Sequence, residues 1–212
     1  MEKWLFKWRL EINAKKCQYI IFGRKKKTST LKLKLFNEFI PQVDQTKFLG
    51  VTLDSRMNFS KCVEEIVNKC NNRLNIIKIL SHKSWKLETN TLKAIYYSLI
   101  RSIIDYNSII YPLLSNSNKN KINAIQYKSL KIAYKQPLKT KTTTLQELAK
   151  TSSIENRIKV LNTRYLSNCI KHNNEQIIDL IKKYKNWYPN SRTPQYKTFM
   201  CNYREVIFSS KL

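Results

Sequence analysis

The hydrophobic period of this chain changes near residue 59. Before that point, alternating or short apolar runs such as LKLKLF favour β-strands, whose side chains alternate with a period of two. After it, apolar residues recur at roughly 3.6-residue intervals, the spacing of an amphipathic helix. The pattern therefore predicts an α+β fold, in which a small antiparallel sheet with an N-terminal helix is followed by a helical bundle.

The apolar runs divide the chain into segments. An N-terminal helix is predicted over 2–11, and the predicted strands are CQYIIFG (17–23), LKLKLF (31–36), EFIPQV (38–43) and KFLGVTL (47–53). Helical spacing continues over 60–80, 92–106, 117–135, 154–169 and 175–184. The last part contains two prolines and loses its period. We therefore expect three parts: 1–59 with the sheet, 60–185 with the helices, and 186–212 as a loosely ordered tail.

The charge of the chain is strongly one-sided. Forty Lys and Arg against fourteen Asp and Glu give a formal net charge of +26. Such a charge repels itself in the compact state unless a polyanion is bound, so nucleic acid is the expected partner. A membrane surface or an acidic protein is the alternative, but no stretch approaches the roughly 18 apolar residues of a spanning helix. We expect no membrane partner and an intracellular location, in the nucleus or the cytoplasm.

The cysteines do not form a metal-binding pattern. Five are present, with no CxxC pair: Cys17, Cys62, Cys70, Cys169 and Cys201. We predict reduced cysteines packed on helices and no metal site, because free cysteine is among the most often buried residues.

Several stretches resemble the C-terminal part of a reverse transcriptase from a non-LTR retrotransposon of the jockey-like, LINE type. The end of the palm is similar to WLFKWRLEINAKKCQYIIFGRK, and the primer-grip hairpin is similar to KFLGVTLDSRMNF. The thumb is similar to LIRSIIDYNSIIYPLL and INAIQYKSLKIAYK. The resemblance covers about residues 1–180 and implies that 1–59 is the end of the palm and 60–185 a thumb-like helical domain.

The resemblance implies an RNA-directed DNA polymerase of a mobile element, with an RNA and DNA template–primer duplex as partner. The missing upstream palm and fingers are a further expected partner. Catalysis in this family needs two Mg²⁺ ions held by aspartates. The chain has no Asp-Asp pair, and the palm strand bearing the first carboxylate is expected upstream of Met1. We therefore predict no catalytic residue, no cofactor in this chain and no polymerase activity of the chain alone.

The candidate primer grip is Phe48, Leu49 and Gly50. A glycine within a strand pattern often marks a close backbone approach, and the resemblance implies that the primer strand approaches here. The alternative is a bulge or packing glycine without a ligand. Residues Phe48, Leu49, Val51 and Leu53 are interpreted as sheet core. Asp54, which follows, is predicted to be a turn residue and not a metal ligand, because two-metal sites need several converging carboxylates.

Basic side chains are the other candidate contacts. We expect phosphate contacts from a basic turn and from the first long helix: Arg24, Lys25, Lys26 and Lys27, then Lys61, Lys69, Arg73 and Lys78. The alternative is a solvated charged surface. The aromatic residues at helical spacing are interpreted as core and not as base-stacking groups: Trp85, Tyr96, Tyr97, Tyr127 and Tyr134.

Two functions follow. The first is a fragment of an RNA-directed DNA polymerase that contributes template–primer binding without the catalytic aspartates. The alternative is a non-catalytic, general nucleic-acid-binding module, either an element remnant or a domesticated piece.

Overall fold

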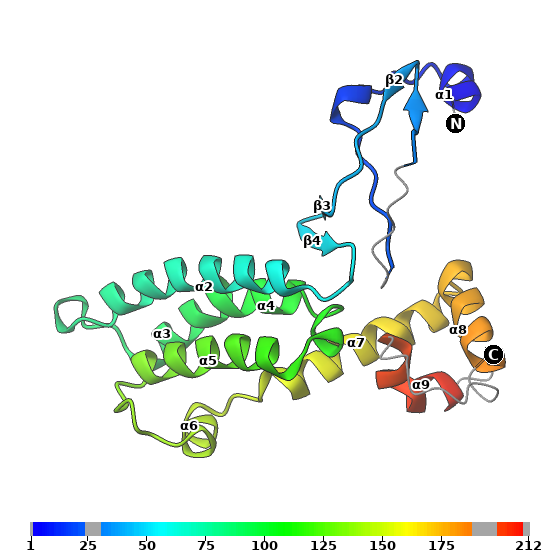
Figure 1. Ribbon diagram of the computed structural model, residues 1–212. Coiled ribbons are helices and arrows are strands. Elements are labelled where there is room, and N and C mark those ends of the chain that lie inside the picture. The colour runs from blue at the N-terminus through cyan, green and yellow to red at the C-terminus, as the bar shows by residue number, and fades with distance from the viewer. Residues whose placement is uncertain (1, 24–30, 188–198, 210–212) are drawn as a thin grey trace. The chain divides into compact units, whose positions relative to one another are not determined.

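The structure is a computed structural model that describes residues 2–23, 31–187 and 199–209 (Figure 1). The chain divides into two compact units, Met1–Cys62 and Val63–Leu212. Short antiparallel sheets come first and helices follow, which confirms the predicted α+β class. Whether the two units are a palm end and a thumb stays a prediction.

The N-terminal unit contains two small sheets, not one. Strand β1 (Lys34–Leu35) pairs antiparallel with β2 (Glu38–Phe39), and β3 (Gln45–Phe48) pairs antiparallel with β4 (Val51–Asp54). The predicted strand over 17–23 was wrong: in this stretch only Tyr19 makes a bridge, to Gln42. The neighbouring Pro41 has no N–H to donate, which limits ladder formation along this pair of segments.

The first helix is shorter than predicted. Helix α1 (Glu2–Lys7) ends because Arg9 adopts a φ of 51°. The Leu10 N–H donates to the Leu5 carbonyl and the Arg9 N–H to the Phe6 carbonyl, which is a Schellman ending. The turn brings Leu5 against Ala14 of η1 (Ala14–Lys16) and Leu35 of β1, and these three buried residues form the small core of the unit.

The second unit is built from helices (Figure 1). They are α2 (Ser60–Leu80, which begins before the unit boundary), η2 (Lys83–Trp85), α3 (Thr89–Tyr96), η3 (Tyr97–Arg101), α4 (Ser102–Tyr106), η4 (Tyr111–Leu113), α5 (Asn116–Ala133), α6 (Thr142–Ala149), α7 (Ile154–Lys171), α8 (Glu175–Trp187), η6 (Phe199–Tyr203) and α9 (Arg204–Ser209). The longer ones overlap the predicted segments, whereas the helices over 142–149 and 199–209 lie outside those segments. Among the described helices, none is long and apolar enough to cross a membrane.

The helical core largely follows the apolar faces of the predicted helical segments, although Tyr106 and Tyr165, which stand at helical spacing, are exposed. Buried side chains repeat along α2, the α3–α4 segment, α5 and α7: Val63, Ile66, Cys70, Leu74 and Ile77; Leu92, Tyr96, Ile100 and Ile104; Ile122, Ile125 and Leu130; Ile154, Ile158 and Leu166. This agreement reflects the helical period, because side chains spaced by three and four residues lie on one face.

The cysteines whose side chains the structure describes are free thiols. Cys62 and Cys70 are buried, and Cys17 and Cys169 are half-buried. Burial raises the pKa of Cys70 to about 11, which keeps its thiol protonated and unreactive at neutral pH. Four of the five cysteines are therefore unpaired in the structure; Cys17 follows η1 and does not lie on a helix as predicted, and the side chain of Cys201 lies outside the described residues.

A buried arginine connects the helices of the second unit. The Arg101 side chain is 2% exposed, and its Nε donates to Asp105 Oδ1 at 3.2 Å. Its Nη1 donates to Tyr96 Oη at 3.3 Å and to Gln126 Oε1 on α5. Asp105 Oδ2 in turn accepts from Arg157 Nε on α7 at 3.1 Å. The network gives Asp105 a structural role and joins three helical segments.

The π-helical geometry of η3 positions this network. Residues Tyr96 and Arg101 are five apart, and an α-helix would direct them to different sides. The wider turn over Tyr97–Arg101 brings both side chains to the same partner, Gln126. Burial raises the pKa of Tyr96 to about 12 even though the adjacent Arg101 acts to lower it, so Tyr96 remains a neutral partner.

The C-terminal segment differs from the predicted loosely ordered tail within its described part. Helix α9 packs through Ile207 against Ile181 and Tyr184 of α8, and Tyr203 is also buried. Asn162 Nδ2 on α7 donates to Tyr203 Oη at 2.8 Å and to the Ser108 carbonyl at 3.0 Å. These tertiary contacts order residues 199–209, and the sequence pattern did not reveal them.

The Arg101 network predicts that Asp105→Asn destabilises the protein by about 3 kcal/mol, because the buried guanidinium loses its neutralising charge. The matched control is Asp179→Asn on α8, whose carboxylate is 60% exposed and pairs with Lys183 at 2.7 Å. We expect the control to change the free energy of unfolding by less than about 1 kcal/mol. Urea denaturation measures both, and equal losses would contradict the role of the network.

Candidate nucleic-acid interface

The β3–β4 hairpin turns at Leu49 and Gly50. The register ends with Phe48 opposite Val51, so these two residues form the whole connection. Their φ angles are 46° and 82°, and two-residue hairpin turns of type I′ require positive φ at both positions. The placement of Gly50 within a strand was therefore wrong: the turn needs its backbone freedom. The hairpin that the resemblance implied is present.

The tip of this hairpin is apolar and exposed. Phe48 is 64% exposed and Leu49 75% exposed, so their interpretation as sheet core was wrong. Val51 and Leu53 are half-buried. The reason is that, among the described residues, this sheet has only two strands. The hairpin thus presents two apolar side chains beside a glycine backbone, a combination suited to the apolar face of a base or sugar.

Asp54 holds the segment that leaves the hairpin. Its Oδ1 accepts from the N–H groups of Arg56 at 3.1 Å and Asn58 at 3.2 Å, and its Oδ2 accepts from the Phe59 N–H at 2.7 Å. Met57 and Phe59 have positive φ angles of 54° and 59°. The carboxylate therefore stabilises a strained turn that leads into α2, which confirms the prediction that Asp54 is a turn residue.

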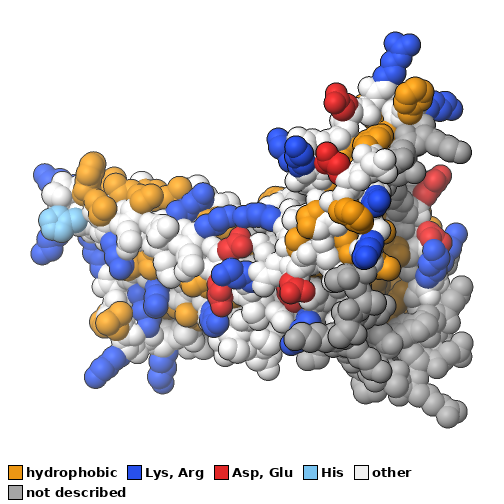
Figure 2. Space-filling model, turned by 45° about the horizontal axis from the view of Figure 1, so that its top comes forward, with side chains coloured by type: hydrophobic (Ala, Val, Ile, Leu, Met, Phe, Trp, Pro, Cys, Tyr) orange, Lys and Arg blue, Asp and Glu red, His pale blue; other side chains and the backbone are white. Residues whose placement is uncertain are grey.

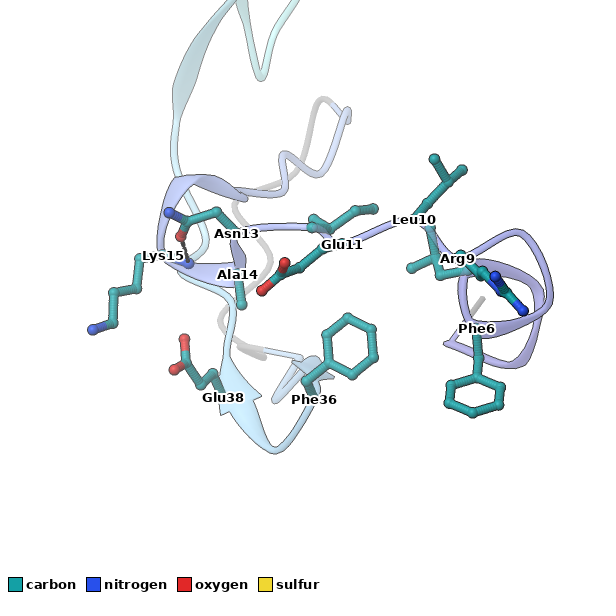
Figure 3. A pocket seen from close by; sticks show the side chains of 11 residues that line it. Phe6, Arg9, Leu10, Glu11, Asn13, Ala14, Lys15, Phe36 and Glu38 are labelled. Atoms are coloured by element: carbon teal, nitrogen blue, oxygen red, sulfur yellow. Dashed lines mark hydrogen bonds between the residues drawn. The ribbon is translucent and has the colours of Figure 1, made fainter.

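The carboxylates of the described residues do not form a metal centre. Within 2–23, 31–187 and 199–209, no group of three or more His, Cys, Asp or Glu could hold an ion. The N-terminal unit has a hollow of about 1030 Å³, in which Glu11 and Glu38 are accompanied by Arg9, Phe6 and Phe36 (Figure 3). Two carboxylates among apolar and basic side chains lack the converging ligand set of a two-metal site.

Three of the predicted basic contacts follow one ridge of α2. Lys61, Lys69 and Arg73 stand at multiples of four residues, which is the spacing of a helix ridge. Both lysines are exposed, but Arg73 is half-buried and its Nη1 donates to the Leu99 carbonyl at 2.8 Å. Arg73 thus also joins α2 to η3. The predicted basic turn Arg24, Lys25, Lys26 and Lys27 lies outside the described residues.

A second basic cluster combines Lys78, which was among the predicted contacts, with three lysines that the sequence interpretation missed. Lys78 on α2 and Lys128, Lys131 and Lys135 on or just after α5 line a groove of about 670 Å³. Lys128, Lys131 and Lys135 recur every three to four residues, and this spacing was a usable signal. Figure 2 shows Lys and Arg side chains spread over the helical unit, with fewer Asp and Glu on the same face.

The aromatic residues divide between core and surface. Tyr96 is buried and Tyr127 and Tyr134 are half-buried, but Trp85 is 55% exposed and Tyr97 is exposed as well. Their interpretation as core was wrong for these two. Trp85 lies in η2, the connection between α2 and α3, where a helical period does not determine burial. Burial also raises the pKa of Tyr111 to about 12.

Comparison with known proteins identifies relatives among the polymerases of mobile elements. The chain is 24% identical over 170 residues to the probable RNA-directed DNA polymerase from transposon BS of Drosophila melanogaster, covering 80% of this chain and 19% of the relative. It is 28% identical over 175 residues to the probable RNA-directed DNA polymerase from transposon X-element, covering 81% of this chain and 19% of the relative. It is 24% identical over 173 residues to the RNA-directed DNA polymerase from mobile element jockey, covering 82% of this chain and 19% of the relative. The X-element and jockey relatives are also from Drosophila melanogaster.

These matches confirm the predicted resemblance: the chain is homologous to RNA-directed DNA polymerases of mobile elements. It spans about a fifth of the length of the curated relatives it matches. No protein-family model matches the chain. No solved structure matches it.

The Asp54 geometry predicts that Asp54→Ala opens the turn over 55–59, because three backbone N–H groups lose their acceptor. We expect a local loss of about 1–2 kcal/mol, the range for removal of a capping side chain. Amide hydrogen exchange of Arg56, Asn58 and Phe59 measures it. The matched control is Asp44→Ala, an exposed aspartate just before β3. Unchanged exchange in Asp54→Ala would contradict the assignment.

Proposed function

We propose that this chain binds a template–primer duplex as part of an RNA-directed DNA polymerase and does not supply the catalytic carboxylates. The homology to such polymerases supports the reaction context. The net charge of +26 supports an anionic partner of extended length. The observation that carries the proposal is the β3–β4 hairpin with its exposed tip. At the end of β4, Asp54 stabilises the turn that leads into α2.

The hairpin tip is the proposed primer grip. Gly50 has no side chain, so a sugar–phosphate backbone can approach it closely. Phe48 supplies an aromatic face for stacking on a base or sugar, and such stacking tolerates any sequence. Leu49 covers the adjoining apolar surface. Because β3 and β4 fix the tip through four paired positions, the contact requires little ordering when the ligand binds.

The basic residues are the proposed phosphate contacts. Lys61 and Lys69 project from α2, and Arg73 shares their ridge while also binding the Leu99 carbonyl. We add the basic turn Arg24–Lys27, on the sequence alone. Contacts of this kind position a duplex without reading its sequence, and an RNA–DNA hybrid would be recognised by its shape.

The residues present do not fit the two Mg²⁺ ions that polymerase chemistry requires. When bound, such ions stabilise the charge that develops on the attacking and leaving oxygens. Here the oxygens of Asp54 accept backbone N–H groups and those of Asp105 accept arginine groups. We therefore propose that this chain holds the duplex and that the ions are bound by parts of the relatives that it does not match.

A general nucleic-acid-binding module is the second candidate. The observation that favours it is the distribution of positive charge along the whole chain, including lysines that are distant from the hairpin in the sequence. Such a module would bind blunt duplex and recessed ends equally, because phosphate contacts carry no information about the end of a strand.

The grip proposal predicts that Phe48→Ser combined with Leu49→Asn removes a preference for a recessed RNA–DNA hybrid end. Both side chains are exposed, and Asn tolerates the positive φ at position 49, so the hairpin is retained. Fluorescence anisotropy measures the ratio of the Kd values for recessed and blunt hybrids. We expect roughly a tenfold loss of preference, on the scale of one stacked base.

The control for this measurement is Leu148→Gln on α6, another exposed leucine. It should leave the ratio unchanged. A wild-type chain without any preference for the recessed end would favour the general binding module. Robust primer extension by the isolated chain in the presence of Mg²⁺ would contradict the proposal that the chain lacks the catalytic carboxylates.

A further inference from the structure

The groove between α2 and α5 is formed within the helical unit alone. One wall is the C-terminal half of α2, with Asn71, Asn75 and Lys78. The other is the C-terminal half of α5 together with the segment that follows it, which includes Gln136 and Leu138. The two walls are therefore parts of one compact unit, and the groove does not depend on how the two units are arranged.

The charge of this groove is of one sign. Its lysines are Lys78, Lys128, Lys131 and Lys135, and among the described residues that line it none is acidic. Lys131 Nζ donates to the Leu138 carbonyl, which fixes the segment after α5 and leaves further ammonium protons for a ligand. Ammonium groups gathered in one groove repel each other, and a bound polyanion removes this cost.

The rest of the lining is suited to bases. Ile132, which is half-buried, and Leu138, which is exposed, provide apolar contact surface. The amides of Asn71, Asn75 and Gln136 offer both donors and acceptors. Cationic side chains beside apolar and amide groups match a ligand with an anionic backbone and flat, partly apolar bases.

The dimensions favour a single strand over a duplex. A volume of about 670 Å³ is within the range of sites that enclose a small ligand, and it accommodates a few nucleotides. A double helix presents its phosphates on a broad convex surface and would contact only the rim.

We propose that this groove binds an unpaired segment of RNA or DNA through its phosphates, separately from the β3–β4 hairpin. The inference deepens the proposed function and rests on it in one respect, that the ligand is nucleic acid. It assigns a single-stranded ligand to Lys78, Lys128, Lys131 and Lys135. The ligands proposed for the hairpin and the α2 ridge do not explain the clustering of these four lysines.

The test compares two triple variants of the full chain. Lys78→Gln, Lys128→Gln and Lys135→Gln remove three charges from the groove. The control triple Lys121→Gln, Lys150→Gln and Lys159→Gln removes three charges from exposed positions on α5, after α6 and on α7. Lys150 matches Lys135 closely, because both follow a helix and adopt positive φ, 43° and 50°.

Fluorescence anisotropy with a 12-nucleotide oligo(U) RNA and with a blunt hybrid of equal length gives the affinities. We expect the groove variant to bind oligo(U) at least tenfold more weakly and the hybrid less than about threefold more weakly. The slope of log K against log salt for oligo(U) should be shallower by about 2, since each phosphate contact on a single strand contributes about 0.7. Control affinities for both ligands should change less than about threefold.

Equal losses in the groove and control variants would overturn the inference, because net charge alone would then explain them. An equal loss on the blunt hybrid, or displacement of oligo(U) by anionic phosphatidylserine vesicles at moderate salt, would also overturn it. Circular dichroism and urea denaturation check that the variants are folded, and crosslinks from 4-thiouridine in the oligomer to the wild-type chain should map to 128–138.

The hairpin variant separates this inference from the proposed function. Phe48→Ser with Leu49→Asn should leave oligo(U) affinity unchanged. If the hairpin variant keeps the recessed-end preference while the groove variant loses oligo(U) binding, the primer grip is wrong and the groove assignment is supported. If the reverse holds, the groove assignment is wrong.

Discussion

A guanidinium that is almost fully removed from water must be neutralised, and in this protein that requirement falls on Arg101. Asp105 supplies the opposite charge from the next turn, and Arg157 binds the other oxygen of the same carboxylate. Gln126 connects the group to α5 and donates onward to the Ser152 carbonyl at 3.2 Å. The positions of α4, α5 and α7 therefore depend on one electrostatic constraint, and the π-helical turn before it provides the geometry.

The helical unit determines where the excess positive charge is displayed. The groove between α2 and α5 is lined by Lys78 together with lysines of α5, and the same α2 presents a separate ridge of basic side chains. The hairpin of the N-terminal unit provides a different kind of surface, apolar and exposed, on a turn that only positive φ angles allow. The two surfaces thus differ in kind, because the hairpin tip is apolar and the groove of the helical unit is lined by lysines.

The agreement between sequence and structure follows the strength of local signals. The buried faces of α2, α5 and α7 were predictable, because a long amphipathic pattern has few alternatives. The absence of a strand over 17–23 was not predictable, since a short apolar run does not specify a partner strand. Phe48 and Leu49 were misassigned to the core because strand alternation does not reveal how many strands a sheet has. Trp85 was misassigned because it lies in a connection and not on a helix.

The sequence by itself determined the α+β class, the helical faces, the net charge, the role of Asp54 as a turn residue and the relationship to polymerases of mobile elements. These properties depend on local periodicity, on residue counts and on motifs of contiguous residues. Only the tertiary structure decided that Gly50 serves a two-residue turn, that Arg101 is buried, and that four lysines from two helices line one groove. The physical reason is that burial and charge clustering arise from contacts between residues distant in the chain, and these form only when the helices pack.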